Sequence, residues 1–344
     1  MHVKTKQIRD FLLNEIGKEP VGAVGRVASN FGISRQAVQY HVAKLVKAGL
    51  VRSTGRTRGA RLQLVRNSER AFFSLAAIDE DQVWRQFVQP KLQTLPRNVF
   101  DICQYGLTEM VNNAIDHSAG TTLTIGVELN ALDATIRVID DGVGIFRKIQ
   151  EAFQLEEERH ALLELTKGKL TTDPARHSGE GIFFTSRVFD QYSILAGNFF
   201  FCHLTSGRDW LVEDRDHTEG TNVTMKISRT SSRRLQEVFD YHTAVPDDFG
   251  FSKTVIPVKL AQFGEENLIS RSQAKRLLNR VERFKEVVLD FSGVEVLGQA
   301  FADEIFRVYA TSHPEVRLHA INENPSVKRM INRALHSDDK PAKD

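Results

Sequence analysis

Apolar residues recur at helical spacing through the first part of the chain. The spacing over residues 5–16 predicts a first helix. A short second helix is expected over 26–31 and a third over 35–48, because a glycine follows each of them and ends the helix. Residues 50–52 and 60–64 predict the two strands of a hairpin around a glycine-containing turn. The first 66 residues therefore predict three helices followed by a β-hairpin.

The pattern changes twice in the rest of the chain. Residues 67–95 predict a mostly helical connector. Residues 96–230 predict a long helix, a pair of strands, two glycine turns separated by a polar helical segment, and further strands. Strands and helices then alternate over 250–338, which is α/β patterning, and 339–344 are a polar tail. We therefore expect a multidomain α+β protein.

Composition narrows the class of protein. The 344 residues, 41% apolar and 26% charged, are enough for two or three globular domains with cores of their own. Apolar stretches fall short of the roughly 20 residues of a membrane helix, and the charged N-terminus is unlike a signal peptide. Cys103 and Cys202 lie far apart in apolar surroundings, which argues against a disulfide framework and a zinc site. We expect a cytoplasmic protein with no membrane partner.

Charge is divided unevenly along the chain. The first 66 residues hold 13 Lys and Arg against 3 acidic residues, a net charge of +10. Because the whole chain carries only +2, the remainder carries −8. A basic segment on an acidic body indicates that nucleic-acid contact is confined to one domain.

The third predicted helix has an apolar and a polar side. Val38, Val42 and Leu45 face its neighbours, and Ser34 caps its start. Glutamine side chains pair with adenine edges, and Arg35 at the helix start reaches guanine or phosphate. The basic hairpin suits phosphates or the minor groove. The candidate DNA-binding residues are Ser34, Arg35, Gln36, Gln39, Tyr40, Arg56, Arg58 and Arg61.

Residues 33–65 resemble a winged helix-turn-helix of the bacterial transcription-regulator type. The resemblance implies that the helix over 35–48 enters the major groove of double-stranded DNA. The alternative is a winged helix used only for dimerisation or protein contact, and the charge of +10 weighs against it.

Residues 109–118 align polar side chains on one side of the long helix. Glu109, Asn113 and His117 follow one another at intervals of four, which core packing explains poorly. Mg²⁺ prefers oxygen ligands and keeps several waters, so one carboxamide together with phosphates is enough to hold it. Glu109, one turn away, is placed to orient or deprotonate a water or a hydroxyl.

Two glycine turns follow this helix. The first ends a strand at Asp140 and contains Gly142 and Gly144. The second contains Gly179 and Gly181 before a helix, where backbone N–H groups and the helix N-terminus favour phosphate. A further glycine, directly before Thr221, is expected to open a strand.

The order of these motifs over residues 96–228 resembles the GHKL (Bergerat) ATP-binding fold of gyrases, histidine kinases and anti-sigma-factor serine kinases. On that resemblance Asn113 binds Mg²⁺, Glu109 is the candidate general base and Asp140 binds the adenine amino group of ATP. Thr221 supports the adenine pocket, and the spacing of His117 is more similar to the anti-sigma kinases than to sensor histidine kinases. The glycines that flank the nucleotide are Gly142, Gly144, Gly179 and Gly181.

Residues 146–178, between the two glycine turns, are long and charged. They are interpreted either as a solvated loop or as an ATP lid whose Lys167 and Lys169 meet the γ-phosphate. Phe183 stands where related motifs have a further glycine, so lid closure is expected to differ.

Residues 253–336 resemble STAS domains, and particularly the STAS-like domain of unknown function found beside GHKL modules. In anti-sigma-factor antagonists one turn of this domain carries a serine that the partner kinase phosphorylates. Here Gly298, Gln299 and Ala300 offer no hydroxyl at that turn. We therefore expect a docking or dimerising module rather than a substrate.

Together these resemblances imply a winged helix, a Bergerat α/β sandwich and a STAS-like α/β domain. We expect an ATP-binding, DNA-binding transcriptional regulator, switched by binding or hydrolysis of Mg-ATP, that forms a homodimer. One alternative is a serine/threonine protein kinase acting on a separate regulatory protein. The other is an ATPase subunit of a multi-component nucleic-acid-sensing system.

Overall fold

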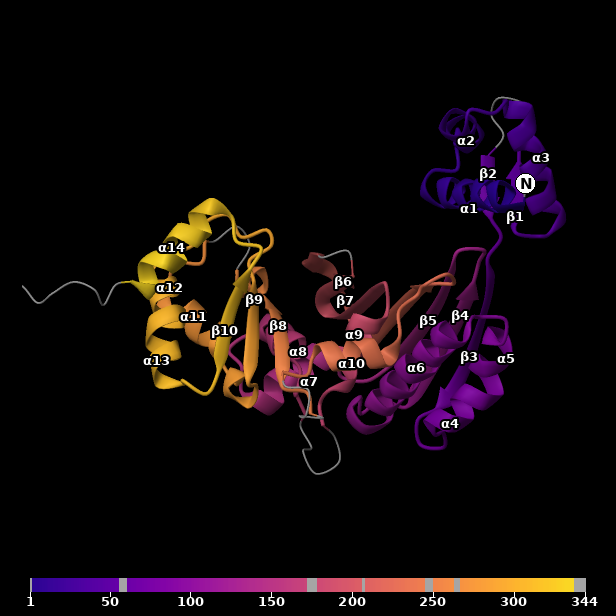
Figure 1. The fold of residues 1–344 in the computed structure, drawn as a ribbon. Helices are drawn as coiled ribbons and strands as arrows, with labels where there is room; N and C mark the ends of the chain where they lie inside the picture. Colours follow the sequence, from indigo (N-terminus) through magenta and orange to yellow (C-terminus); the bar gives the residue numbers. More distant parts are fainter. Residues whose placement is uncertain are drawn as a thin grey trace, which may run out of the picture.

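The chain folds into three regions (Figure 1), and its described residues form three hydrophobic cores. The computed structural model describes residues 2–55, 61–171, 178–205, 208–244, 250–262 and 267–336. We call the three regions the head (residues up to 64), the middle part (67–244) and the C-terminal part (from 250). Within these described ranges no helix is both long and apolar enough to cross a bilayer.

The head consists of three helices and an antiparallel hairpin, with its core between them. Val38, Val42 and Leu45 are buried, as their spacing predicted. Ser34 caps the third helix, because its Oγ accepts a hydrogen bond from the Ala37 amide at 3.1 Å. The elements are α1 (His2–Lys18), α2 (Ala23–Phe31), α3 (Arg35–Lys47), β1 (Val51–Thr54) and β2 (Arg61–Leu64).

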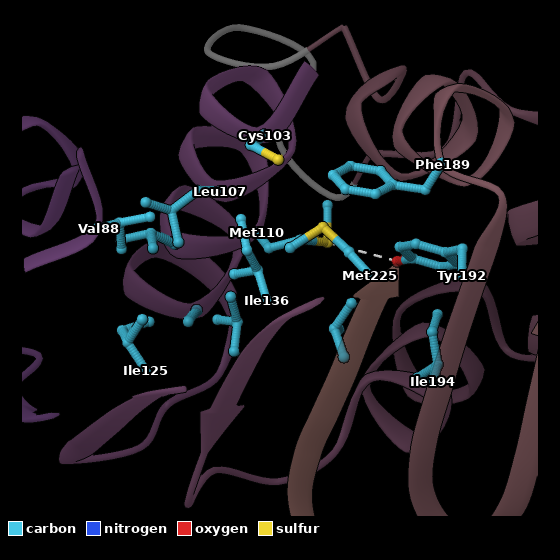
Figure 2. Packing of buried hydrophobic residues seen from close by; sticks show 14 of the residues in the cluster. Val88, Cys103, Leu107, Met110, Ile125, Ile136, Phe189, Tyr192, Ile194 and Met225 are labelled. Carbon is cyan, nitrogen blue, oxygen red and sulfur yellow. Dashed lines mark hydrogen bonds between the residues drawn. The ribbon is translucent and has the colours of Figure 1, made fainter. Parts of the chain in front are cut away.

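The middle part is built on a five-stranded antiparallel sheet in the order β3-β4-β5-β7-β6. The long helix α6 (Arg97–His117) packs on one of its faces. Figure 2 shows Met110, Met225 and Tyr192 in this core, where the Tyr192 hydroxyl donates to Met110 Sδ at 3.4 Å. The strands are β3 (Asn67–Ser74), β4 (Thr122–Leu129), β5 (Asp133–Asp140), β6 (Gln191–Leu204) and β7 (Arg208–Ser228).

The prediction of a helical connector over residues 67–95 is wrong for the first part of this segment. Residues 67–74 form the edge strand β3, which pairs with β4 along its whole length. Helical structure begins only with α4 (Glu80–Val83), the π-helical turn η2 (Trp84–Val88) and α5 (Gln89–Leu92). These short helices bury apolar side chains in the core of the middle part, so the segment belongs to this part rather than linking two others.

The strands β6 and β7 form a long hairpin. Gly220, which we expected to open a strand, lies inside β7 with φ +71°. The pairing register shifts nearby, around Gly197 of β6, which also has a positive φ. A positive φ suits glycine, so the turn-like sequence signal marks an irregularity in a continuous strand.

The segment between the two glycine turns is folded and packed, not a solvated loop, over its described residues. It forms α7 (Ile145–Phe153) and α8 (Glu158–Lys167), and the next helix is α9 (Gly181–Val188). Leu165 joins the core of the middle part, whereas Leu163 joins the core of the C-terminal part. The helix α8 therefore contributes to two cores at once.

The C-terminal part has a three-stranded parallel sheet in the order β10-β9-β8 with helices between the strands, as the α/β pattern predicted. The sequence over 271–284 predicts a single helix, but the helix ends at Leu278, because Asn279 (ψ 127°) and Arg280 (φ 64°) leave the helical conformation. The strands are β8 (Lys253–Pro257), β9 (Glu286–Asp290) and β10 (Arg317–Ile321). The helices include α11 (Arg271–Leu278), α12 (Gln299–Asp303), η5 (Glu304–Tyr309), α13 (Ala310–Ser312) and α14 (Pro325–Leu335). The helix α10 (Leu235–Tyr241) contacts both the middle and the C-terminal core, because Val238 packs against each of them.

Candidate functional site

One cavity gathers most of the residues that we expected at a nucleotide site. It lies between α6, the end of β5, the interior of β7 around Thr221, and the start of α9. The convergence is not local in sequence, since the lining residues span more than 100 positions of the chain. The predicted residues that line it are Glu109, Asn113, His117, Asp140, Gly144, Gly179, Gly181 and Thr221.

The helix α6 supplies three of these residues from one side. Its opposite side buries Leu107, Val111 and other apolar residues against the sheet, which fixes the helix in place. The side-chain Nδ2 atom of Asn113 is buried and has no hydrogen-bond partner among the described residues. A buried polar atom without a partner is costly, so the site is suited to a polar ligand. Rotating the same amide by 180° presents its oxygen, the ligand atom that Mg²⁺ prefers.

Asp140 lies at the end of β5 and is 7% exposed. Its Oδ1 accepts hydrogen bonds from the Gly142 amide at 2.9 Å and the Thr221 amide at 3.2 Å. Burial raises the pKa of Asp140, while these hydrogen bonds act in the opposite direction. The Thr221 hydroxyl in turn accepts from the Ile145 amide at 3.1 Å, so β5, β7 and the start of α7 are tied together at the cavity.

The first glycine turn is shaped by close backbone approach. Gly142 does not line the cavity, but a Cβ atom at this position would lie 2.1 Å from the Ser118 carbonyl oxygen. The next amide, of Val143, donates to that same oxygen at 2.9 Å. Glycine is therefore required here to dock the turn on the end of α6.

The second glycine turn packs against Glu109. A Cβ atom on Gly181, the first residue of α9, would lie 2.0 Å from Glu109 Oε2. Gly179 has φ +73°, and its carbonyl oxygen accepts from the Leu170 amide at 3.1 Å. The absence of a side chain at Gly181 leaves room for Glu109 beside the N-terminus of a helix, where an anion is favoured. At Gly179, in contrast, a Cβ atom would meet the Leu170 backbone at 2.5 Å.

The structure does not bring Lys167 and Lys169 into the cavity. Lys167 is only 1% exposed, and its ammonium pairs with Glu164 at 2.6 Å. The same ammonium donates to the Arg276 and Asn279 carbonyls of the C-terminal part. Lys169 Nζ donates to the Arg283 carbonyl at 3.1 Å. Both side chains are thus engaged by the C-terminal part, a contact that the local sequence does not reveal, and we leave them out of the candidate site. Residues 172–177 of the expected lid lie outside the described residues.

Several lining residues were missed by sequence reasoning. Tyr192 and Leu170 have only apolar or aromatic side chains to identify them, and such residues occur throughout the cores. Lys148, four residues after Gly144 on α7, also lines the cavity. Its position shortly after a glycine turn is the one signal that could have identified it.

The candidate DNA-binding residues of α3 lie together on its outer side. Arg35, Gln36, Gln39 and Tyr40 are exposed, and Lys44 Nζ lies 4.3 Å from the centre of the Tyr40 ring. Ser34 is also exposed, although its hydroxyl serves as the helix cap, and Arg61 is exposed on β2. Arg56 and Arg58 lie outside the described residues.

Comparison with known families identifies one region of the chain. Residues 273–328 match a STAS-like domain of unknown function (DUF4325). The chain carries a STAS-like domain. The match falls within residues 253–336, which we expected to resemble such a domain, and it covers β9, β10 and the helices between them. A search of curated proteins gave no match to the chain.

Proposed function

We propose that the chain is an ATP-binding, DNA-binding transcriptional regulator in which Mg-ATP in a GHKL-type site switches conformation or assembly. The observation that carries the proposal is the convergence of eight predicted residues on a single cavity. The STAS-like domain would serve as a docking or dimerising module of a homodimer. The coupling between nucleotide and DNA is motivated by the fusion of these parts in one chain.

The cavity residues fit a magnesium-bound nucleotide. Asn113 offers a carboxamide with a buried atom that lacks a protein partner, and it would hold Mg²⁺ together with the phosphates. Asp140 is fixed by two backbone amides at the side of the cavity where the purine would bind. The phosphates would lie toward Gly179, Gly181 and the start of α9. When bound, the ion neutralises phosphate charge, and Glu109 would orient or deprotonate the attacking water or hydroxyl.

The head supplies the surface for DNA. Its net charge of +10 attracts the phosphate backbone, and α3 presents amide, aromatic and guanidinium side chains on its exposed side. This arrangement supports a winged helix-turn-helix with α3 as the recognition helix.

The proposal is tested by measuring DNA affinity with and without Mg-ATP. A labelled duplex selected from a random-sequence pool is titrated with the full chain by fluorescence anisotropy. Regulation requires the two states to differ by about 1–3 kcal/mol, or roughly 5- to 150-fold in affinity. Asn113→Ala should remove the ATP effect while retaining DNA binding. Equal affinity with and without Mg-ATP in the wild-type chain would refute the switch.

A second candidate function is favoured by the surroundings of Glu109. This residue also borders an open groove that is lined by Tyr105, Gln236 and Asp240 and lies next to the cavity. A hydroxyl group of a separate protein could reach Glu109 through this groove, as a serine/threonine kinase would require. Labelled γ-phosphate transferred to a candidate partner protein would support the kinase, whereas labelled free phosphate would support an ATPase.

A further inference from the structure

The segment at the end of α8 faces the cavity and the C-terminal part at the same time. Leu165 and Leu170 line the cavity. The neighbouring residues instead contact the C-terminal part, through the side chains of Glu164, Lys167 and Lys169. The helix α8 lies beside β8 (Figure 1). A few consecutive residues therefore connect the wall of the cavity to the STAS-like domain.

Lys167 acts as a cap for the C-terminal end of α11. Its ammonium donates to Glu164 Oε1 at 2.6 Å, to the Arg276 carbonyl at 3.2 Å and to the Asn279 carbonyl at 2.8 Å. These three acceptors match the three N–H groups of a lysine. The last carbonyls of a helix lack partners within it, and the negative end of the helix dipole favours a cation. Lys167 is thus a specific link between the two parts and not an incidental surface contact.

The backbone of Lys167 and the two residues after it make further contacts with the C-terminal part. Thr254 Oγ1 donates to the Lys167 carbonyl at 2.7 Å. Lys169 and Arg283 each donate from the side chain to the carbonyl of the other, both at 3.1 Å. Gly168 between them has φ +80°, and a Cβ atom there would lie 2.5 Å from the ring of Phe251. The backbone over three consecutive residues is consequently held by the C-terminal part.

Residues 167–169, the held segment, are followed by Leu170, which is hydrogen-bonded to the second glycine turn. The Leu170 amide donates to the Gly179 carbonyl at 3.1 Å, and Gly179 itself lines the cavity. A displacement of residues 167–169 would therefore move both Leu170 and the turn that we propose for the phosphates.

We infer that the STAS-like domain, docked through Lys167, holds residues 167–169 and thereby positions the adjoining wall of the nucleotide cavity at Leu165 and Leu170, so that docking and nucleotide binding strengthen each other. The inference rests on the proposed nucleotide site and names its regulation. When the STAS-like domain holds residues 167–169, this segment is already ordered before the nucleotide binds. When it is released, the segment must be ordered during binding, and the entropy that this costs lowers the affinity for the nucleotide. Because coupling between two equilibria is reciprocal, the nucleotide must also tighten the docking of the STAS-like domain.

The test compares Lys167→Met with the wild-type chain. The substitution keeps the apolar stem and removes all three hydrogen bonds of the ammonium. We expect the affinity for a non-hydrolysable ATP analogue with Mg²⁺, measured by calorimetry, to fall by about tenfold or more. Lys328→Met on α14 is the matched control, because it removes an exposed ammonium that pairs with Glu323 at 3.8 Å. The control should bind as the wild type does.

Hydrogen exchange gives a readout that does not depend on turnover. In the wild type the analogue should slow amide exchange in α11 as well as at the cavity. Without nucleotide, Lys167→Met should speed exchange in residues 163–171 and in α11 together. Thr254→Val removes one hydrogen bond with little change of volume, so it tests the same link if Lys167→Met does not fold, and its affinity should fall in the same direction.

The outcomes separate the two proposals. If the wild type binds the analogue but the variants bind it equally well or more tightly, or if α11 is unaffected by the analogue, the docking inference is overturned and the site stands. If the wild type binds no analogue, the proposed site fails and the inference fails with it.

Discussion

At the scale of single residues, two glycines at the candidate site and beside it lie close to different kinds of neighbour. A side chain at position 142 would meet the backbone oxygen of Ser118 at 2.1 Å. A side chain at position 181 would meet the carboxylate oxygen of Glu109 at 2.0 Å. Backbone packed in a core cannot move aside, whereas the end of a side chain can. The same substitution should therefore have different consequences at the two positions.

Gly142→Ala should destabilise the chain by about 2 kcal/mol or more, because the turn must leave the end of α6. Gly181→Ala should cost less than about 1 kcal/mol in stability but displace Glu109. Any ATP hydrolysis or phosphate transfer should then fall by about 100-fold, the usual contribution of a general base. Urea denaturation and a phosphate assay measure the two effects. A Gly181→Ala variant with wild-type turnover would argue against Glu109 as the base.

His242 provides a prediction about pH. It is 3% exposed among the rings of Phe183, Phe184 and Phe251, and its Nδ1 donates to the Lys253 carbonyl at 3.1 Å. Burial lowers the pKa of His242 from 6.5 to about 4. Below pH 6.5 the imidazole of His242 is protonated in the unfolded chain but stays neutral in the folded chain. The free energy of unfolding therefore decreases as the pH falls from 6.5 toward 4.

His242→Asn should remove this pH dependence, since the amide retains a donor for Lys253 but does not titrate. The wild type should lose about 2 kcal/mol more than the variant between pH 7 and pH 5, because one pKa unit corresponds to about 1.4 kcal/mol. Denaturation curves at both pH values give the difference. Parallel losses in the two proteins would show that His242 is not held neutral by the fold.

At the scale of elements, the structure confirms what local signals predicted. The strands β4 and β10 could be predicted, because alternating side chains and turn residues mark them within the sequence. The helix α3 follows from Ser34 at its start and from its buried stripe. The strand β3 could not be recognised in this way, since it is an edge strand of mostly polar residues whose partner β4 begins about 50 positions later.

The same distinction applies to the candidate site. Polar residues at regular intervals on α6 and glycines in turns carry a local signal, and the structure brings them to one cavity. The role of Lys167 carries no such signal, because its acceptors Arg276 and Asn279 lie more than 100 positions away. The motifs of the site could therefore be predicted from the sequence, whereas the contacts between separate parts of the chain could not.

The helix α11 depends on caps at both ends, which gives a prediction for the element. At its start, Ser270 and Gln273 form a reciprocal capping box. Ser270→Ala should lower stability by about 1 kcal/mol. Ser326→Ala, an exposed serine in the first turn of α14, is the control and should change stability by less than about 0.5 kcal/mol. Equal melting temperatures for the two variants would contradict the role of the cap.

At the scale of the whole molecule, the positive charge is concentrated in the head, whereas the candidate nucleotide site lies in the middle part. The basic head carries +10, and the rest of the chain carries −8. The acidic parts repel DNA, so phosphates should be contacted by the head alone.

Arg35→Ala should weaken DNA binding and lower the slope of log affinity against log salt by about one, the value for one lost phosphate contact. Gln39→Ala should instead reduce discrimination between sequences and leave the salt slope unchanged. Titrations at several salt concentrations measure both. An unchanged slope for Arg35→Ala would show that this residue does not contact the backbone.

The central claim is that the cavity between α6 and the two glycine turns binds Mg-ATP. Isothermal titration calorimetry of ATP into the full chain tests it most directly, with and without Mg²⁺. We predict one nucleotide per chain for the wild type, and no Mg²⁺-dependent binding for Asn113→Ala, which should keep the wild-type fold by circular dichroism. No heat of binding for the wild type, or the same Mg²⁺-dependent affinity for both proteins, would contradict the account.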